Sequence, residues 1–202
     1  MTSDSYIDFH AHHHSLAGER VIQDGIDTRG RHPWHLTPST SPASDEPHTN
    51  EGRFLAIGES GLDKVCDTPY DLQLKVFREE VALSEQLGKP LFLHCVRAID
   101  DILRIHRELD VRQPWIWHGY RGNAQQIKQL LLLPTPIYFS FGIHYNDQAL
   151  LACPLDRLLL ETDEDTTTPI ADHYAQVAHL KGLSLDELIR QMHDNFHTLF
   201  GE

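Results

Sequence analysis

Six side chains able to bind a metal ion lie at the ends of short apolar runs in this sequence. They are four histidines and two acids: His10, His12, Glu59, His94, His118 and Asp163. Each stands at the C-terminal end of a segment that predicts a buried β-strand. A lone histidine at such a place is most often hydrogen-bonded or solvated. In parallel α/β folds, however, these strand ends share one face, where active sites lie. The six residues are therefore predicted to form one cluster.

The pair His10 and His12 has the spacing by which one strand presents two imidazoles to one ion. Side chains alternate along a strand, so both histidines point to one side and Ala11 points to the other. A buried carboxylate is costly unless it is paired or bound to a metal. Glu59 and Asp163, together with four histidines, therefore imply a cation.

The size of this ligand set predicts two divalent metal ions. Four imidazoles and two carboxylates exceed the four protein ligands of a structural zinc site. The surplus predicts one bridging carboxylate and open positions for water and substrate. Nitrogen and oxygen ligands without thiolate favour zinc, manganese, cobalt or magnesium, and four histidines make magnesium alone less natural. Paired metals suit phosphoester hydrolysis, because one generates hydroxide and both stabilise the oxyanions of the displacement.

Seven short apolar segments predict the strands that position these residues. They alternate with helical patterns and read YIDFHAHH, VIQDGID, RFLAIGES, PLFLHCV, PWIWHGY, IYFSFGI and RLLLETD. Alternating strands and helices are typical of a parallel sheet, and seven strands are one short of a full barrel. We expect an α/β fold with an incomplete TIM-barrel-like architecture of about seven parallel strands, in one domain over residues 1–202. An open doubly wound sheet is the alternative.

Local signals set the ends of several predicted helices. Asn123 is expected to cap one helix, and Ser184 with Glu187 forms the sequence signature of a capping box for the last helix. Thr68 is expected to cap the helix that follows the third predicted strand. The polar segment Thr37–Glu51, rich in proline and serine, is expected to be a surface loop.

Composition narrows the partners and the compartment. The formal net charge of −13 argues against a broad basic surface for duplex nucleic acid. A bound metal can still attract a phosphate. The 15 histidines are unusually many beside 17 lysines and arginines. The first residues do not resemble a signal peptide, and no apolar run approaches the roughly 20 residues that cross a bilayer. We expect a cytoplasmic protein with no membrane contact and no obligate protein partner.

Several stretches of the sequence resemble, in order, the motifs of the TatD family of metal-dependent hydrolases. They are DFHAH, RHPWH, AIGESGLDK, LFLHCVRA, WHGYRG and LLLETDED, and the closing helix LSLDELIRQMHDNFHTLF extends the match. GESGLD and LLETD, in order with the histidines, are the most specific. The resemblance implies a TIM-barrel-like fold and deoxyribonuclease or broader phosphodiesterase activity. It also implies metal binding by the six residues named above, with Asp163 and Glu59 orienting or activating the water.

The sequence departs from the family pattern at two places. Only about twenty residues separate His12 from the HPW motif, so one βα unit of the longer members is missing. After the ETD motif the usual proline is replaced by Glu164, and DEDTTTPIADHY stands where a basic loop is common. The substrate is therefore expected to be the end of a single-stranded nucleic acid or a small phosphoester.

Two further residues are predicted to contact the substrate. His32 could bind a phosphate or, equally well, pack against Trp34 in a proline turn. Lys64 follows GLD at the predicted mouth and could bind a phosphate or be a solvated loop lysine. Two other activities stay open: hydrolysis of a C–N bond or lactone by an amidohydrolase-type metalloenzyme, and metal binding by a catalytically inactive barrel.

Overall fold

The computed structural model describes residues 6–13, 19–39 and 54–201, and contacts divide the chain into two compact units. Unit 1 comprises Met1–Asp24 and His118–Glu202, and unit 2 comprises the intervening Gly25–Trp117. The single domain expected from the sequence stays a prediction. Among the described residues, none of the helices combines the length and the apolar character needed to cross a membrane.

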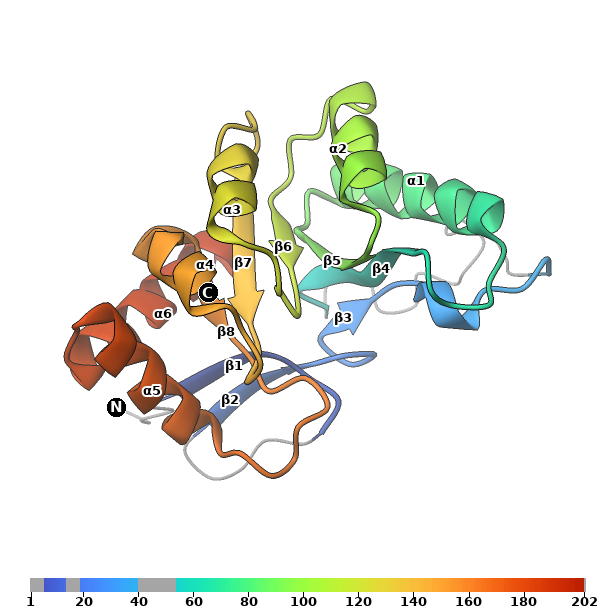
Figure 1. Ribbon diagram of the computed structural model, residues 1–202. Helices are drawn as coiled ribbons and strands as arrows, with labels where there is room; N and C mark the ends of the chain where they lie inside the picture. The colour runs from blue at the N-terminus through green and yellow to red at the C-terminus, as the bar shows by residue number, and fades with distance from the viewer. Residues whose placement is uncertain (1–5, 14–18, 40–53, 202) are drawn as a thin grey trace. The chain divides into compact units, whose positions relative to one another are not determined.

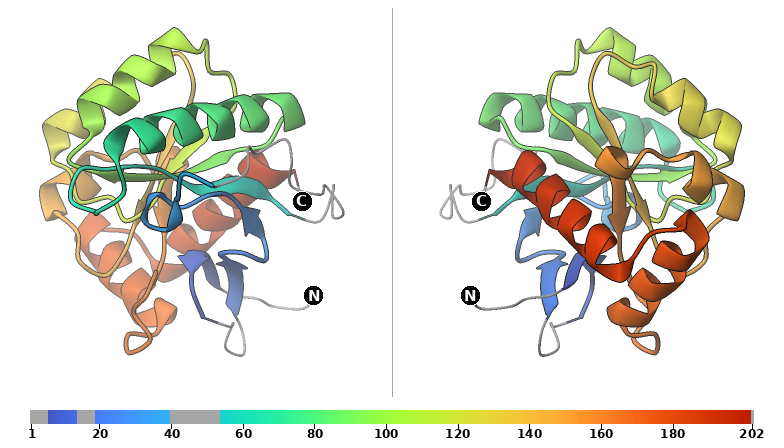
Figure 2. Two further views of the ribbon diagram at one scale, coloured as in Figure 1. Left: turned by 90° about the vertical axis from the view of Figure 1, so that its right-hand side faces the viewer. Right: turned by 90° about the vertical axis from the view of Figure 1, so that its left-hand side faces the viewer.

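The described residues of unit 2 form a parallel sheet with two α-helices and the short 3-10 helix η1 (Figures 1 and 2). Its strands follow the order β3–β4–β5–β6, and neighbours pair in parallel. The elements are β3 (Thr28–Arg29), η1 (Pro33–His35), β4 (Ala56–Asp63), α1 (Tyr70–Leu87), β5 (Leu91–Val96), α2 (Ile99–Glu108) and β6 (Trp115–Trp117). Because all four strands run the same way, their C-terminal ends lie along one edge of the sheet.

The core of unit 2 is built where the helices cover the sheet. Val76, Phe77 and Val81 form the buried face of α1, which contacts β4. Trp115 of β6 is also buried, and its ring lies 5.7 Å from that of Phe77 and 4.9 Å from that of His106 in α2. Trp115 therefore packs under α1 and α2 as part of the core.

Unit 1 contains two pairs of parallel strands and four α-helices among its described residues. The elements are β1 (Tyr6–Ala11), β2 (Glu19–Gln23), α3 (Ala124–Leu130), β7 (Ile137–Phe141), α4 (Asp147–Ala152), η3 (Leu155–Arg157), β8 (Leu158–Leu160), α5 (Ile170–Lys181) and α6 (Leu185–Phe200). β1 pairs with β2, and β7 pairs with β8. An isolated parallel bridge joins Ala11 to Asp163.

Helices α5 and α6 contact each other and pack on β1 (Figure 2). The ring of Phe196 in α6 lies 6.2 Å from that of Phe9 in β1. The hydroxyl of Tyr174 in α5 donates to the carbonyl oxygen of Ile7 at 2.7 Å and accepts from the Ile7 amide. These contacts fix the strand that carries His10.

The second predicted strand differs from the structure. The segment VIQDGID (residues 21–27) contains only the end of β2 and a turn, and β3 begins directly after it, so the described residues contain eight strands. The Asp24-Gly25 dipeptide causes the break, because Gly25 has a left-handed backbone (φ 74°) that a continuous strand does not contain.

Two of the three predicted helix caps are confirmed. Asn123 and Ser184 each accept from the backbone amide three residues later, in complete capping boxes. The prediction for Thr68 is wrong: Pro69 is the N-cap residue of α1, and no side chain caps this end. The carbonyl oxygen of Thr68 instead accepts from Gln73 Nε2 at 2.8 Å. Of the predicted loop Thr37–Glu51, residues 37–39 are exposed and the remainder lies outside the described residues.

Candidate metal centre

Three side chains of unit 2 form a compact group at the C-terminal edge of its sheet. His94 Nδ1 lies 2.8 Å from Glu59 Oε1, and His32 Nε2 lies 3.0 Å from the same oxygen and 3.3 Å from His94 Nδ1. Glu59 comes from β4, His94 from β5 and His32 from the segment after β3. Glu59 and His94 are buried. Two imidazole nitrogens and one carboxylate oxygen, all within 4.8 Å of one another, are a donor set that suits a divalent cation.

Glycines allow the backbone approach that places Glu59 next to His94. A Cβ on Gly61 would lie 1.8 Å from the carbonyl oxygen of His94, and one on Gly58 would lie 2.5 Å from that of Phe92. Gly58 also has φ 127°, which side-chain-bearing residues rarely adopt. The register of β4 against β5 shifts between Ile57 and Ser60. The GESG sequence is therefore required for β4 to lie this close to β5.

Asp63, the last residue of β4, holds His94 from its other side. Asp63 Oδ2 lies 3.3 Å from His94 Nε2 and accepts from Trp34 Nε1 at 2.7 Å. Asp63 Oδ1 accepts from the amides of Val65 and Cys66. Burial raises the pKa of the Asp63 carboxyl, but the hydrogen bonds from Trp34, Val65 and His94 outweigh it and set that pKa below its usual value. An ionised carboxylate only accepts, so with a metal ion at Nδ1 the Asp63 carboxylate would accept from Nε2–H and orient the ring.

A second group of possible ligands lies in unit 1, where β1 meets the segment after β8. Asp163 Oδ1 lies 3.5 Å from His12 Nε2 and 3.8 Å from His10 Nε2. The backbone fixes this relation: the amide of Asp163 donates to the His10 carbonyl at 2.9 Å, and the amide of His12 donates to the Asp163 carbonyl at 3.2 Å. Asp163 has φ 57°, a left-handed conformation that aspartate tolerates better than most residues. Both histidines face the same carboxylate, which agrees with the predicted alternation.

His118 lies next to the second group and brings in an acid that the sequence analysis missed. Its ring centroid is 4.6 Å from that of His10, and its Nδ1 is 3.6 Å from Glu161 Oε1. His118, Glu161 and Asp163 offer ligand atoms within 4.8 Å of one another. Glu161 is 0% exposed. Its Oε1 accepts from the amide of Gly119 at 2.6 Å. Its Oε2 has no hydrogen-bond partner among the described residues.

A signal for Glu161 was present in the sequence. It follows the apolar run of β8 and stands two residues before Asp163, the same spacing that relates His10 to His12. A buried ionised carboxylate with one vacant oxygen is costly without a cation. Glu161 is therefore a further candidate ligand.

Beneath the second group, the buried acid Asp8 connects β1 to Thr162. Asp8 Oδ2 accepts from the Thr162 hydroxyl at 2.5 Å, and Asp8 Oδ1 accepts from the Thr162 amide at 3.1 Å. The Thr162 hydroxyl oxygen also lies 2.8 Å from His13 Nε2. Burial raises the pKa of the Asp8 carboxyl to about 6, although the hydrogen bonds from Thr162 oppose the rise.

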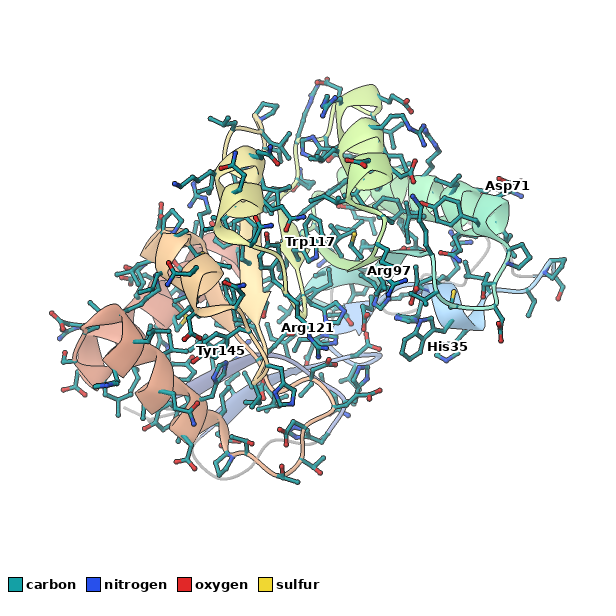
Figure 3. The ribbon with its side chains drawn as sticks, viewed as in Figure 1. His35, Asp71, Arg97, Trp117, Arg121 and Tyr145 are labelled. Carbon is teal, nitrogen blue, oxygen red and sulfur yellow. The ribbon has the colours of Figure 1, made fainter. Side chains whose placement is uncertain are left out.

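The two predicted substrate contacts differ in their surroundings. His32 lies within the ligand group of unit 2, with its ring centroid 4.9 Å from that of Trp34, so the predicted packing against Trp34 is present and the phosphate contact stays a prediction. Lys64 Nζ is 2.7 Å from Asp101 Oδ2 and is thus engaged in an ion pair. Arg97, directly after β5, is exposed and makes no hydrogen bond or ion pair with another described residue (Figure 3).

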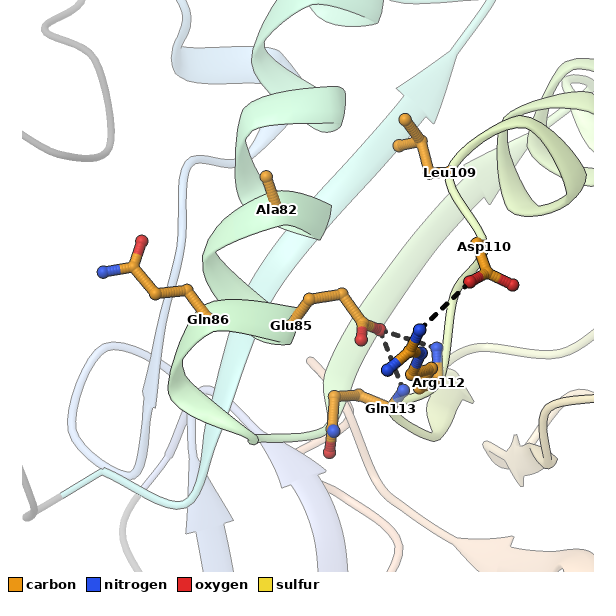
Figure 4. A pocket seen from close by; sticks show the side chains of 7 residues that line it. All are labelled: Ala82, Glu85, Gln86, Leu109, Asp110, Arg112 and Gln113. Carbon is orange, nitrogen blue, oxygen red and sulfur yellow. Dashed lines mark hydrogen bonds and ion pairs between the residues drawn. The ribbon is translucent and has the colours of Figure 1, made fainter.

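A pocket of about 580 Å³ lies elsewhere in unit 2 (Figure 4). It is lined by the C-terminal half of α1 and the connection from α2 to β6: Ala82, Glu85, Gln86, Leu109, Asp110, Arg112 and Gln113. Glu85 accepts from the amides of Arg112 and Gln113, both at 2.8 Å. Arg112 and Gln113 precede β6, so this pocket is at the N-terminal end of that strand and not at the edge that carries His94.

Both units carry predicted ligands. Glu59 and His94 lie together in unit 2, with His32. The other four lie in unit 1: His10, His12, His118 and Asp163. The expectation that all six surround one point stays a prediction.

This structure defines an α/β protein with groups of histidine and carboxylate side chains at the ends of parallel strands. The family model described as TatD related DNase matches residues 7–201. The chain therefore belongs to the TatD family, as the motifs indicated.

Known relatives agree with this assignment. The metal-dependent hydrolase YabD of Bacillus subtilis is 28% identical over 169 residues, which cover 73% of this chain and 66% of YabD. The 3'-5' ssDNA/RNA exonuclease TatD of Klebsiella pneumoniae is 31% identical, over 86% of this chain and 76% of that protein. This chain thus spans about two thirds of the length of YabD.

A solved structure shows the fold. The crystal structure of YjjV, a TatD homologue from Escherichia coli K12, superposes with a TM-score of 0.74 at 24% sequence identity. The match covers 93% of this chain and 78% of that chain. The predicted α/β fold of the TIM-barrel type is confirmed.

Proposed function

We propose that the chain is a divalent-metal-dependent phosphodiesterase that cleaves phosphoester bonds with an activated water. The observation that carries the proposal is the triangle formed by Glu59 of β4, His94 of β5 and His32 after β3, with sides of 2.8, 3.0 and 3.3 Å. Three polar side chains converging this closely are costly to maintain without a cation. The order of the family motifs and the name of the Klebsiella relative support the phosphodiester as the bond that is cleaved.

The proposal assigns metal binding to the six predicted residues: His10, His12, Glu59, His94, His118 and Asp163. When bound, divalent metal ions lower the pKa of a coordinated water and neutralise charge on the phosphate. We infer that two ions bind, and zinc is the first metal to test because imidazoles dominate the set.

Two acids are proposed to act on the water. Asp163 is partly exposed, with 31% of its side chain accessible, so its carboxylate can accept a proton from a water that enters from solvent. Glu59 is buried between two imidazoles and is suited to hold charge and orient the water. Asp63 positions His94 from behind through Nε2.

The proposed substrate is the end of a single-stranded nucleic acid or a small phosphoester. The net charge of −13 disfavours a long polyanion, and Lys64 already pairs with Asp101. His32 and Lys64 remain the proposed phosphate contacts, and a substrate phosphate would compete with Asp101 for Lys64. The cytoplasm remains the proposed location.

The test is an activity panel on metal-free protein reconstituted with zinc, manganese, cobalt or magnesium. Its substrates are single-stranded DNA, RNA, bis-p-nitrophenyl phosphate, an amide and a lactone. Metal-dependent cleavage of the first three, absent with Asp163→Asn, is the expected result. Cleavage of the amide or lactone alone would replace the proposal with an amidohydrolase activity. Metal binding without any turnover would leave an inactive metal-binding barrel.

A further inference from the structure

Trp34 is an exposed aromatic side chain held in a fixed position. It is 53% exposed, whereas the other two tryptophans, Trp115 and Trp117, are 1% and 6% exposed. Its indole Nε1 donates to Asp63 Oδ2 at 2.7 Å. It follows Pro33, the first residue of η1, whose ring restricts the backbone at this point. The indole ring is therefore oriented before any ligand arrives.

The ring of Trp34 lies beside the ligand group of unit 2. Its centroid is 4.9 Å from that of His32 and 5.8 Å from that of His94, and both ring pairs are nearly perpendicular. Asp63 Oδ2 accepts from Trp34 and also lies 3.3 Å from His94 Nε2. One carboxylate oxygen thus ties the position of the indole to that of a proposed metal ligand.

The chemistry of this place fits a nucleobase. Every base has a flat π-face, and an exposed aromatic ring next to a phosphate-binding group is how many proteins hold single strands. In a nucleotide the base is joined to the phosphate through one sugar, so a phosphate bound at His32 brings its base toward the neighbouring ring. His35, also exposed, lies next to His32, with ring centroids 5.6 Å apart (Figure 3).

We propose that Trp34 is the stacking platform for the nucleobase next to the scissile phosphodiester. This inference rests on the proposed function, since it takes the substrate to be a phosphodiester bound at the ligand group. It adds a preference that the metal site alone does not provide: substrates that carry a base bind better than abasic ones.

The experiment measures binding in the metal-loaded Asp163→Asn background, which is expected to bind without cleaving. The probes are a thymidine trinucleotide and an abasic trinucleotide of the same charge. Binding of the base-bearing probe should quench the tryptophan fluorescence and be tighter than binding of the abasic probe. Adding Trp34→Leu should remove the quenching and weaken binding of the base-bearing probe about fivefold or more. Affinity for the abasic probe should change much less.

One variant separates stacking from the hydrogen bond to Asp63, and a second controls for loss of an exposed apolar side chain. Trp34→Phe keeps an aromatic face but loses the hydrogen bond to Asp63 Oδ2, so it should retain most of the preference for the base-bearing probe. Leu132→Ala, which removes an apolar side chain that is 85% exposed, should change nothing. Loss of the preference in Trp34→Phe as complete as in Trp34→Leu would overturn the inference, because the hydrogen bond would then be responsible.

The experiments distinguish failure of the stacking platform from failure of the proposed phosphodiesterase activity. If the wild-type chain cleaves phosphodiesters but binds both probes equally, the platform is wrong and the activity stands. If the base-bearing probe binds with quenching that depends on Trp34 while no substrate is cleaved, the platform stands and the activity is wrong. Failure of both probes to bind overturns the platform.

Discussion

Thr162 donates both its hydroxyl and its amide hydrogen to the buried carboxylate of Asp8, at 2.5 and 3.1 Å. Asp8 belongs to β1, two residues before His10, and Thr162 directly precedes Asp163. The pair therefore joins the two segments that carry the ligand group of unit 1. The same carboxylate accepts from the His10 amide at 3.3 Å, so it also supports the backbone of that ligand.

Replacing this hydroxyl should weaken unit 1. In Thr162→Val the side chain keeps its shape, but Asp8 Oδ2 loses its donor in a buried place. We expect the free energy of unfolding to fall by about 1–3 kcal/mol in urea titrations. The matched control is Thr198→Val, since that exposed hydroxyl donates only to the Asp194 carbonyl in α6. Equal stability of the two variants would show that the pair contributes nothing.

Asp163→Asn should abolish turnover and leave most of the metal bound. The amide keeps one oxygen ligand but cannot accept a proton or carry charge. Asparagine also tolerates the left-handed backbone at this position, so the local fold should be preserved. Metal content by elemental analysis and activity on bis-p-nitrophenyl phosphate provide the two readouts. Substantial activity in this variant would remove Asp163 from the proposed catalytic role.

Asp63→Asn should lower metal affinity without unfolding the chain. The amide group can offer only one accepting oxygen, while the present carboxylate accepts from Trp34, Val65 and Cys66 and contacts His94. Loss of a group that orients a metal-binding histidine typically costs about 10- to 100-fold in affinity. Competition with a chelator measures the affinity, and circular dichroism checks the fold. The control is Asp71→Asn on the exposed first turn of α1; if both variants bind metal as the wild type does, Asp63 does not position His94.

The sequence predicted local geometry where the pattern was simple, but it did not predict that β4 continues past Glu59 to Asp63. The alternation in β1 predicted that His10 and His12 share a side, and both face Asp163. Capping at Asn123 and Ser184 depends only on residues three apart, so the sequence also predicted it. Strand periodicity did not predict that β2 ends at Gln23, because apolar residues stand on both sides of the Asp24-Gly25 turn.

The roles of side chains that act through tertiary contacts could not be predicted from the sequence. Asp8 is an acid within the apolar strand β1, and one sequence does not show that Thr162 offsets its burial. Likewise, the ion pair of Lys64 with Asp101 joins residues 37 positions apart and depends on the packing of α2 on β5. Placement of the six ligands around one point depends on long-range geometry of the same kind and stays a prediction.

Acid should destabilise unit 2 through His106. This histidine is buried against Trp115. Burial lowers its pKa, Arg107 lowers it further and Glu85 opposes them. The folded state therefore keeps His106 neutral where the unfolded state takes up a proton. The stabilising contribution is complete above the unfolded pKa of about 6.5 and is lost as the pH falls from there toward the folded pKa.

The measurement is the free energy of unfolding at pH 7.5 and pH 5 for the wild type and His106→Phe. The phenyl ring keeps the contact with Trp115 but does not titrate. We expect the variant to lose less stability over this interval, by on the order of 1 kcal/mol. The control is His179→Phe, at an exposed position of α5, and its loss of stability over this interval should equal that of the wild type. Parallel curves for all three proteins would exclude His106 as the source.

Binding of single strands should depend only weakly on salt. Each neutralised phosphate adds about 0.7 to the slope of log K against log salt for single strands. In the described part of unit 2, Lys64 already pairs with Asp101, and Arg97 is the exposed cation next to β5. One or two phosphate contacts then give a slope of about 1, as expected for an enzyme that holds a strand end or a small substrate. The measurement uses Asp163→Asn with oligonucleotides between low and physiological salt. A slope of about 4 would correspond to six contacts and reveal a basic track, which would contradict the end-directed substrate and favour a nuclease that follows many phosphates.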